Sequence, residues 1–280
     1  MAKKENPVTR LSDHTYNHLI CGYPLMELTG NITFSEALYL CLKGELPGEK
    51  ELKMLDVLLT SGIDGGGLGN AQTQVARCIA TANRDDPMAA VGGSLLAFGS
   101  TTGSPAFTAQ FVEDAYAFMK KESLNKEETA KRVVTDSRKQ GKRIPGLGHR
   151  WYPTGDPRAI RIRECAELYG FVGERTLLYD AISAELGRLT GRPMQPNIDG
   201  GFAVAGLELG LHPIVLGPLF ALGLLPGTIA HVQEEIEEHE SRSIRRFIDE
   251  RINWEYVGPS KRHLPEKKIG VPLVKVKLEE

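Results

Sequence analysis

Apolar residues recur at helical spacing along most of the chain, and capping residues mark where these segments begin and end. Leu52, Leu55 and Leu59 follow one face of a helix predicted over residues 49–60. A capping-box pattern that begins at Thr33 opens an earlier helix, which we expect to stop near residue 44. The same signals predict helices over residues 70–82, 86–98, 104–121, 125–141, 157–169, 174–189, 199–209, 213–224 and 226–238.

Only the last segment of the chain alternates like a strand, because Val274, Val276 and Leu278 are separated by lysines. The predicted fold class is therefore all-α, with residues 271–278 as its one strand. This class excludes a Rossmann or a barrel enzyme. The 280 residues are enough for one large domain or two modest ones.

Composition excludes several classes of partner. The net charge is −2, and the four cysteines are widely spaced without a Cys-x-x-Cys pair, as is typical of reduced thiols in a cytoplasmic protein. The chain begins with polar residues, and its best apolar run (residues 214–229) is interrupted by Pro218 and Pro226. We therefore expect a cytoplasmic protein with no membrane partner, no nucleic-acid partner and no metal site.

Basic residues greatly outnumber acids between residues 142 and 163. This segment contains five arginines, one lysine and one histidine against a single acid, Asp156. Asp156 and Pro157 have the pattern of an N-cap and a first helical residue, so the arginines that follow lie at the positive end of a helix dipole. An anionic ligand would explain them, and a solvated basic face is an equally weighted alternative. The arginines of this helix are Arg158, Arg161 and Arg163.

A glycine turn precedes this helix and would let a ligand approach the backbone closely. Glycines leave backbone N–H groups accessible, and a run of such groups can form an anion-binding nest. The spacing of the turn is not that of a P-loop, and no strand is predicted before it. The turn is therefore a candidate anion site, formed by Lys142, Arg143, Gly146, Leu147, Gly148 and Arg150.

Several motifs, in order, resemble the signature of the citrate synthase superfamily, and the resemblance extends from about residue 21 to residue 265. Within the superfamily, the short length, Asn-Ile-Asp-Gly-Gly at 197–201 and Gly-Ser-Thr-Thr-Gly at 99–103 are most similar to citryl-CoA lyases. The shared motifs are Pro-Gly-Leu-Gly-His-Arg at 145–150, Thr-Gly-Asp-Pro-Arg-Ala at 154–159, Pro-Asn-Ile-Asp-Gly at 196–200, Leu-Phe-Ala-Leu-Gly at 219–223 and Gly-Thr-Ile-Ala-His at 227–231.

The resemblance implies a citrate-synthase-like fold with two helical domains. Residues 1–104 and 199–280 would form the large domain, and residues 105–198 the smaller one. A coenzyme A thioester would bind as a substrate in the cleft between them, with no tightly bound cofactor. From the cations and backbone amides of the glycine turn, we expect the adenine and phosphates of coenzyme A to bind there. The implied partners are acetyl-CoA or another acyl-CoA, a 2-oxo acid such as oxaloacetate, and a second copy of the chain in a homodimer.

The resemblance also assigns roles to four residues. Asp199 matches the catalytic aspartate that acts as general base, and His149 matches the histidine that hydrogen-bonds the ketone or hydroxyl oxygen of the acid. Arg158 matches a carboxylate-binding arginine, and Arg251 matches a further one in different surroundings. From local sequence alone, the alternatives are an N-cap for Asp199, a turn histidine for His149 and a helix-end cation for Arg251.

Three positions depart from the family pattern. Thr102 stands where citrate synthases have the histidine that polarises the thioester carbonyl, so a hydroxyl or a backbone N–H is the strongest donor expected there. An earlier family histidine is replaced by a glycine within residues 64–69, and an expected arginine is replaced by Leu224. His231 also matches a family position, but its apolar surroundings favour a structural core histidine.

We predict an acyl-CoA lyase that reversibly cleaves citryl-CoA, or a related 3-hydroxyacyl-CoA, to acetyl-CoA and a 2-oxo acid. One alternative is a citrate-synthase-type condensing enzyme, and another is a non-catalytic relative that only binds coenzyme A. The presence of His149, Arg158 and Asp199 favours an enzyme, because a binding module needs no base.

Overall fold

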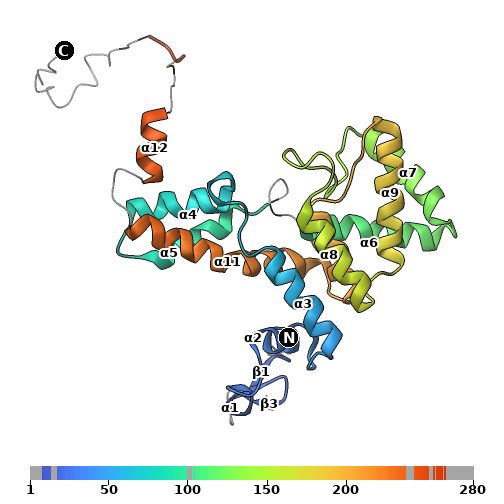
Figure 1. Ribbon diagram of the computed structural model, residues 1–280, viewed down its shortest axis with the longest axis horizontal. Coiled ribbons are helices and arrows are strands. Elements are labelled where there is room, and N and C mark those ends of the chain that lie inside the picture. Colours follow the sequence, from blue (N-terminus) through green and yellow to red (C-terminus); the bar gives the residue numbers. More distant parts are fainter. Residues whose placement is uncertain are drawn as a thin grey trace, which may run out of the picture.

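The computed structural model describes residues 8–13, 18–99, 103, 105–237, 243–251, 255, 257–260 and 262. Helices dominate these residues, which confirms the predicted all-α class. In Figure 1 the long helix α11 (Pro213–Glu237) runs beside α4 (Ala71–Ala82) and α5 (Pro87–Ser94), and α6 to α9 lie together at the other end. The other helices are α1 (Leu25–Leu28), α2 (Phe34–Lys43), α3 (Glu49–Ser61), α6 (Pro105–Lys121), α7 (Lys126–Lys139), α8 (Pro157–Tyr169), α9 (Glu174–Thr190), α10 (Ile198–Glu208) and α12 (Ile244–Arg251), with 3-10 turns η1 (Gly67–Gly69) and η2 (Leu95–Ala97).

The predicted helix starts are confirmed where capping residues define them. The Thr33 hydroxyl accepts from the Glu36 amide, and the Glu36 carboxylate accepts from the Thr33 amide, so the capping box of α2 is complete. Asn125 and Glu128 form the same box at the start of α7. Asp156 caps α8, and the bounds of that helix are the predicted ones.

The N-terminal region contains a small sheet that the sequence pattern did not predict. Three two-residue strands, β1 (Ser12–Asp13), β2 (Leu19–Ile20) and β3 (Tyr23–Pro24), pair antiparallel in chain order. Strands of this length are too short to show an alternating pattern, which explains why they were missed. The strand predicted over residues 271–278 lies outside the described residues and stays a prediction.

The prediction of separate helices over residues 213–224 and 226–238 is wrong, because α11 continues through both prolines. Pro226 has no N–H for the helix ladder, and the amide of the following residue, Gly227, donates to Ile63 O at 3.0 Å. Gly227 has no side chain, so the backbone at Ile63 can lie directly against the helix. A bond outside the helix thus compensates for the interruption at the proline.

By length and composition alone, α11 could cross a membrane. In the structure, however, it packs against α3, α4, α5, α6 and α10. Leu219, Phe220 and Leu224 of α11 are buried in the largest hydrophobic cluster. The burial of these residues in the core therefore explains why much of α11 is apolar.

The largest hydrophobic cluster joins helices from both predicted domains around α10. Tyr39 of α2, Met54 of α3, Ile162 of α8 and Tyr179 of α9 share this cluster with Phe202 of α10. Nine of the eleven residues of α10 are buried. Smaller clusters join α6, α7 and α9, and α4, α5 and α11. The division into domains at residues 105 and 198 stays a prediction.

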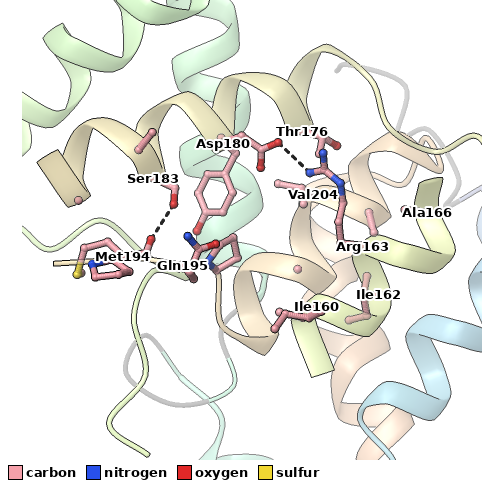
Figure 2. Close-up of a pocket in the computed structure, with 18 of the residues that line it drawn as sticks. Ile160, Ile162, Arg163, Ala166, Thr176, Asp180, Ser183, Met194, Gln195 and Val204 are labelled. Atoms are coloured by element: carbon pink, nitrogen blue, oxygen red, sulfur yellow. Dashed lines mark hydrogen bonds and ion pairs between the residues drawn. The ribbon is translucent and has the colours of Figure 1, made fainter. Parts of the chain in front are cut away.

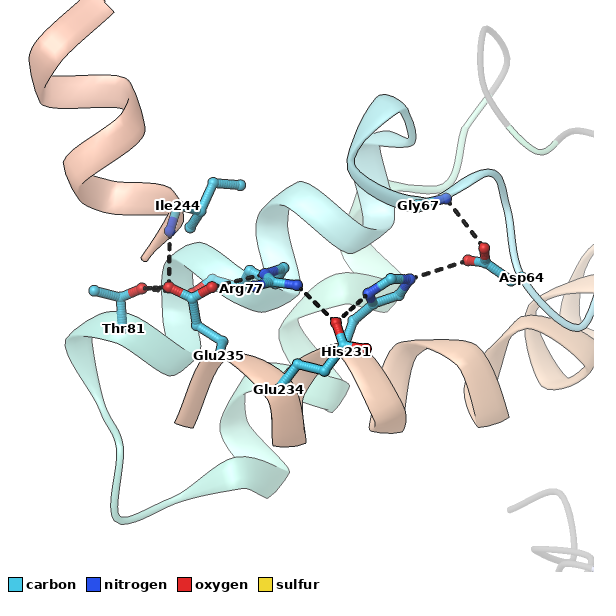
Figure 3. Close-up of polar contacts among 8 residues, drawn as sticks. All are labelled: Asp64, Gly67, Arg77, Thr81, His231, Glu234, Glu235 and Ile244. Atoms are coloured by element: carbon cyan, nitrogen blue, oxygen red, sulfur yellow. Dashed lines mark hydrogen bonds and ion pairs between the residues drawn. The ribbon is translucent and has the colours of Figure 1, made fainter. Parts of the chain in front are cut away.

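An ion pair ties α4 to α11 in the part of the fold shown in Figure 3. Arg77 Nε donates to Glu235 Oε2 at 2.6 Å, and the two side chains are 9% and 0% exposed. The other oxygen of Glu235 accepts from the Thr81 hydroxyl and from the amide of Ile244, the first residue of α12. Every oxygen of this buried carboxylate is therefore hydrogen-bonded, as burial of a charge requires.

His231 extends this network toward the glycine run at residues 64–69. Its Nδ1 lies 3.3 Å from Glu234 Oε2, and its Nε2 lies 3.3 Å from Asp64 Oδ1. Glu234 also accepts from Arg77, and Asp64 accepts from the amide of Gly67. His231 thus has partners on both ring nitrogens, in agreement with its interpretation as a structural histidine.

Candidate active site

Residues 146–148 and residues 195–197 pair as two short antiparallel segments, which we call the junction. His149 directly follows the first segment, and Asp199 comes two residues after the second. The pairing therefore joins the two chain segments that lead into these predicted catalytic residues, which are fifty positions apart in the chain. The bonds of the junction are Gly148 N to Gln195 O at 2.8 Å, Asn197 N to Gly146 O at 2.9 Å, and Asn197 Nδ2 to Gly148 O at 2.9 Å.

The junction depends on glycine at two positions. Gly146 has a φ of +74°, which side chains rarely adopt, and a Cβ there would lie 2.8 Å from the Cα of Gly200. The turn therefore rests directly on the first turn of α10. Gly148, with a φ of +77°, then directs the chain away toward His149.

Asp199 lies in the first turn of α10 and is not its N-cap. The N-cap is Asn197, whose side-chain oxygen accepts from the amide of Gly200 at 3.2 Å. The local alternative of an N-cap role for Asp199 is therefore wrong, since Asn197 already performs that role. Asp199 Oδ1 is buried beside the junction, near the positive end of the α10 dipole.

A single buried aspartate, Asp156, connects α8 to the start of α10. It is 1% exposed. Its Oδ1 accepts from the amide of Arg158 at 3.1 Å, and its Oδ2 accepts from the amide of Ile198 at 3.0 Å. The guanidinium of Arg158 completes the site, with Nε 3.0 Å from Oδ1 and Nη2 2.8 Å from Oδ2. Nη1 is the one nitrogen of Arg158 that is not part of this pair.

These contacts determine the charge on Asp156. Burial raises the pKa of Asp156, but the hydrogen bonds and positive charge of Arg158, together with the two backbone amides, outweigh that effect. The pKa of Asp156 therefore lies below its usual value of 3.8. The aspartate is ionised near neutral pH and holds Arg158 in place.

His149 is arranged as a neutral hydrogen-bond donor. Burial lowers its pKa, the negative charge of Asp156 opposes that shift, and nearby arginines add to it, so the net effect is a pKa below 6.5. Nδ1 accepts from the amide of Trp151 at 3.1 Å. In a neutral ring with Nδ1 as acceptor, the proton is on Nε2, which can donate to a substrate oxygen. The rings of Tyr152 and Trp151 lie 4.9 and 5.7 Å from the imidazole and hold it from the side.

Residues 52–247 match the family model described as citrate synthase, C-terminal domain. This chain belongs to the citrate synthase family. A similar solved structure is the citryl-CoA lyase from Hydrogenobacter thermophilus, with 30% identity, a TM-score of 0.81, and coverage of 94% of this chain and 99% of that one. The ATP citrate lyase of Methanosaeta concilii, in complex with (3S)-citryl-CoA, shares the fold at 18% identity and a TM-score of 0.71, over 93% of this chain and 43% of that one.

Two sequence alignments with citrate synthases each cover less than half of this chain. The glyoxysomal citrate synthase of Cucurbita maxima is 30% identical over 134 residues, which cover 45% of this chain and 26% of that protein. Citrate synthase 1 of Mycobacterium tuberculosis strain H37Rv is 36% identical over 113 residues, or 38% of this chain and 26% of that protein. The matched part thus spans about a quarter of the length of these relatives.

The arginines of α8 do not require an anionic ligand, which corrects the argument from local charge. Arg161 pairs with Glu164 at 2.7 Å. Arg163 pairs with Glu167 at 2.8 Å and with Asp180 of α9 at 2.9 Å. These acids lie one turn along the same helix or on a neighbouring helix, so a count of charges over residues 142–163 alone could not reveal them.

Unlike the arginines of α8, the cations of the glycine turn have no acidic partner among the described residues. Lys142, Arg143 and Arg150 are exposed, and none of them joins an ion pair within the described part of the chain. Arg150 stacks 4.2 Å above the ring of Trp151. Ile144, 6% exposed, anchors the turn in the hydrophobic cluster of α6, α7 and α9. Within the residues that the structure describes, the positive charge at this turn is therefore not neutralised by an acid.

Arg251 is not brought to the junction, and Thr102 lies outside the described residues. Arg251 ends α12 and stacks on Phe247 at 4.1 Å, and α12 packs on α4, at the opposite end of the molecule from α8 in Figure 1. Leu224 is 4% exposed and belongs to the largest hydrophobic cluster.

The glycine run at residues 64–69 reaches the turn through Trp151. A Cβ on Gly69 would lie 3.0 Å from the Cη2 atom of Trp151. A Cβ on Gly65 would overlap the side chain of Asn70, the N-cap of α4, so no larger residue fits there while Asn70 keeps its place. The motifs did not indicate the contact with Trp151, because it joins two loops far apart in sequence.

A cavity of about 850 Å³ adjoins the junction between α8, α9 and residues 191–196. Figure 2 shows the Arg163–Asp180 pair at one end of it and the Ser183 hydroxyl, which donates to Met194 O at 2.8 Å, at the other. Among the described residues, none of those predicted to contact substrate or coenzyme A lines this cavity. The sequence-predicted site is therefore on a different face of residues 194–196, where they pair with the glycine turn.

Replacing Asp156 with asparagine should destabilise the protein in a pH-dependent way. Folding lowers the pKa of Asp156, so its stabilising contribution is complete above the unfolded value of about 3.9 and is lost as the pH falls through the lower folded value. In urea unfolding, Asp156→Asn should lose about 1–3 kcal/mol at pH 7 relative to the parent protein. The difference in free energy of unfolding between the variant and the parent protein should become smaller below about pH 4.

The control for this series is Asp136→Asn, which changes an exposed aspartate of α7. The free energy of unfolding of this variant should equal that of the parent protein at every pH. A destabilisation by Asp156→Asn that is equal at pH 7 and pH 3 would contradict the assignment of an ionised, paired Asp156.

Proposed function

We propose that this chain is an acyl-CoA carbon–carbon lyase, which reversibly cleaves citryl-CoA or a related 3-hydroxyacyl-CoA to acetyl-CoA and a 2-oxo acid. The observation that carries the proposal is the junction, whose paired backbone segments lead directly into His149 on one side and into Asp199 on the other. Similarity to a citryl-CoA lyase over nearly the full length of both chains supports the same reaction. A neighbour with the same fold is in complex with (3S)-citryl-CoA.

Asp199 is the proposed proton carrier. In cleavage, the bond between the carbinol carbon and the acetyl methylene breaks, and its electron pair passes into an acetyl-CoA enolate. Asp199, protonated at this stage, delivers its proton to the enolate carbon and becomes a carboxylate. The proton lost from the substrate hydroxyl returns to that carboxylate through water, so that one proton is lost and one is gained. In condensation the same carboxylate removes a methyl proton, because microscopic reversibility gives one residue both roles.

His149 is the proposed donor to the oxygen of the acid. Its Nε2–H would hydrogen-bond the hydroxyl of the substrate and the ketone of the product, where negative charge develops as the carbon–carbon bond breaks or forms. The remaining Nη1 of Arg158 would bind a carboxylate of the acid, while Asp156 keeps the guanidinium in position. Thr102 is proposed to contribute a hydroxyl donor to the thioester carbonyl.

The acid substrate is proposed to make fewer charged contacts than citrate or oxaloacetate normally receives. Leu224 replaces a family arginine and is buried among apolar side chains, so it supplies no charge to a substrate carboxylate. Loss of a charge-assisted bond corresponds to about 1.5–3 kcal/mol. A smaller or more apolar 2-oxo acid would lose less binding free energy when leucine replaces the arginine.

A homodimer in the cytoplasm is the proposed state of the protein. Large apolar side chains of α5, η2 and α11 are exposed, and a second copy would cover them. Because α12 lies away from the junction, Arg251 would serve as a substrate-binding residue only from that second copy. The exposed side chains are Met88, Leu96, Ile214 and Ile229.

A citrate-synthase-type condensing enzyme is the main alternative, because family membership and the junction suit both reactions. A synthase goes on to hydrolyse the acyl-CoA intermediate, which makes condensation effectively irreversible. With Thr102 in place of the thioester-polarising histidine, attack by water on the thioester is expected to be slow. A non-catalytic coenzyme A-binding relative would need neither Asp199 nor the neutral His149.

Reversing the charge of Arg143 and Arg150 to glutamate should weaken binding of coenzyme A, because unpaired cations and backbone amides meet its phosphates at the glycine turn. Thermal unfolding should be nearly unchanged, since both side chains are exposed. Calorimetric titration with coenzyme A measures the effect. The matched control is Lys131→Glu with Arg132→Glu on α7, which makes the same change in net charge at exposed positions. Equal affinities in the two double variants would remove the basis for the assignment.

Oxaloacetate, pyruvate and 2-oxobutyrate should differ little as acceptors in the condensation direction. A missing ion pair of about 1.5–3 kcal/mol removes roughly a tenfold to hundredfold preference for the second carboxylate. The measurement is kcat/KM for each acid with acetyl-CoA, with products identified by mass. A preference for oxaloacetate of several orders of magnitude would show that another cation serves the pocket.

Asp199→Asn should abolish exchange of the acetyl-CoA methyl protons with solvent, because an amide cannot act as the base. The parent enzyme should release acetyl-CoA from citryl-CoA faster than it releases free citrate. Deuterated acetyl-CoA followed by mass, and product analysis with citryl-CoA, measure the two effects. The control Asp56→Asn, at an exposed position of α3, should retain exchange. Rapid release of citrate would favour the synthase, and exchange in Asp199→Asn would exclude Asp199 as the base.

A further inference from the structure

The hydroxyl of Tyr179 reaches the junction from α9, although no motif marks this residue. Tyr179 is fully buried and belongs to the largest hydrophobic cluster. Its hydroxyl donates to the carbonyl oxygen of Pro145 at 2.7 Å. Pro145 directly precedes Gly146, the first residue of the junction, so this bond fixes the start of the turn that carries His149.

Two glycines leave room for the hydroxyl. A Cβ on Gly146 would lie 2.5 Å from the oxygen of Tyr179, and a Cβ on Gly200 would lie 3.0 Å from it. Gly146 is three residues before His149, and Gly200 directly follows Asp199. The hydroxyl therefore contacts both of the segments that position the proposed catalytic groups.

Tyr179 is not placed to act as a general base. Burial raises the pKa of Tyr179 well above its ordinary value, and the negative charge of Asp199 adds to that shift. The hydroxyl stays protonated, and its one proton is used in the bond to Pro145 O. What it contributes is the position of the turn relative to α10.

We propose that Tyr179 is a positioning residue that sets the distance between the base Asp199 and the donor His149. It does so by holding the carbonyl of Pro145 against the first turn of α10. The inference rests on the proposed function, in which these two groups act on the two sides of one carbon–carbon bond. A misplacement of about 1 Å between such groups can lower a rate about a hundredfold.

Tyr179→Phe tests this inference, because it removes one oxygen atom and leaves the ring in place. The kcat for citryl-CoA cleavage and the rate of methyl-proton exchange should both fall about tenfold to a hundredfold. The KM for citryl-CoA should change less than about threefold, since the groups that bind substrate remain. A merely structural role would not produce this separation of kcat from KM.

The matched control is Tyr39→Phe. Tyr39 is 1% exposed, belongs to the same hydrophobic cluster, and donates its hydroxyl to Glu51 Oε1 at 2.8 Å, within α2 and α3. The control also loses a hydrogen bond donated by a tyrosine hydroxyl, here to a carboxylate, and should likewise show a fall in melting temperature. Its kcat and exchange rate should equal those of the parent enzyme.

The outcomes separate this inference from the proposed function. If the parent enzyme neither exchanges methyl protons nor cleaves citryl-CoA, the proposed function fails. If the parent is active and Tyr179→Phe matches it in kcat, the positioning role of Tyr179 is wrong. Failure of Tyr179→Phe to fold, beside a folded Tyr39→Phe, would also contradict the inference, because a positioning role requires that the fold survive without the hydroxyl.

Discussion

The close approach of Gly146 to Gly200 is the constraint on which the site depends. Because neither residue has a side chain, the turn before His149 can rest on the first turn of α10, which carries Asp199. The backbone bonds of the junction then become possible, since residues 146–148 lie alongside residues 195–197. A methyl group at either glycine would separate the two segments and with them the two predicted catalytic residues.

The charges around this contact are arranged in two zones. Near the junction, the ionised Asp156 is satisfied by Arg158 and by two backbone amides, and His149 is neutral. Farther out on the turn, Arg143 and Arg150 are exposed and unpaired within the described residues. Such an arrangement suits a substrate whose negatively charged group lies away from its reacting atoms. The cations of the turn would bind the charged group, while hydrogen bonds and one base would act at the reacting atoms.

The helices and the positions of the motifs could largely be predicted, because both can be read from local sequence, whereas the pairing of the two motifs in the junction came from the structure. The capping residues Thr33, Asn125 and Asp156 defined helix starts correctly, and the family motifs identified the two segments of the junction. The continuation of α11 through Pro226 could not be predicted, because the compensating bond comes from Ile63, far away in sequence.

Long-range contacts also explain what local sequence left open in the predicted site. A count of charges along the chain left an anionic ligand and a solvated basic face equally open for Arg163, because one of its partners, Asp180, belongs to another helix. For Asp199, the prediction that it acts as the base is untouched, and the structure excludes only the local alternative, because Asn197 is the N-cap. Tyr179 belongs to no family motif. Only the structure shows that its hydroxyl lies close to Gly146 and Gly200 and donates to Pro145 O.

Amide hydrogen exchange at Gly148 and Asn197 tests the rigid junction most directly, because these two amides donate its backbone bonds. Both should be protected in the parent protein, and both should lose protection together in Gly146→Ala. The amide of Gly227, which donates to Ile63 O elsewhere in the fold, should keep its protection in that variant. Rapid exchange of Gly148 in the parent protein, or protection of both amides in Gly146→Ala, would contradict the account.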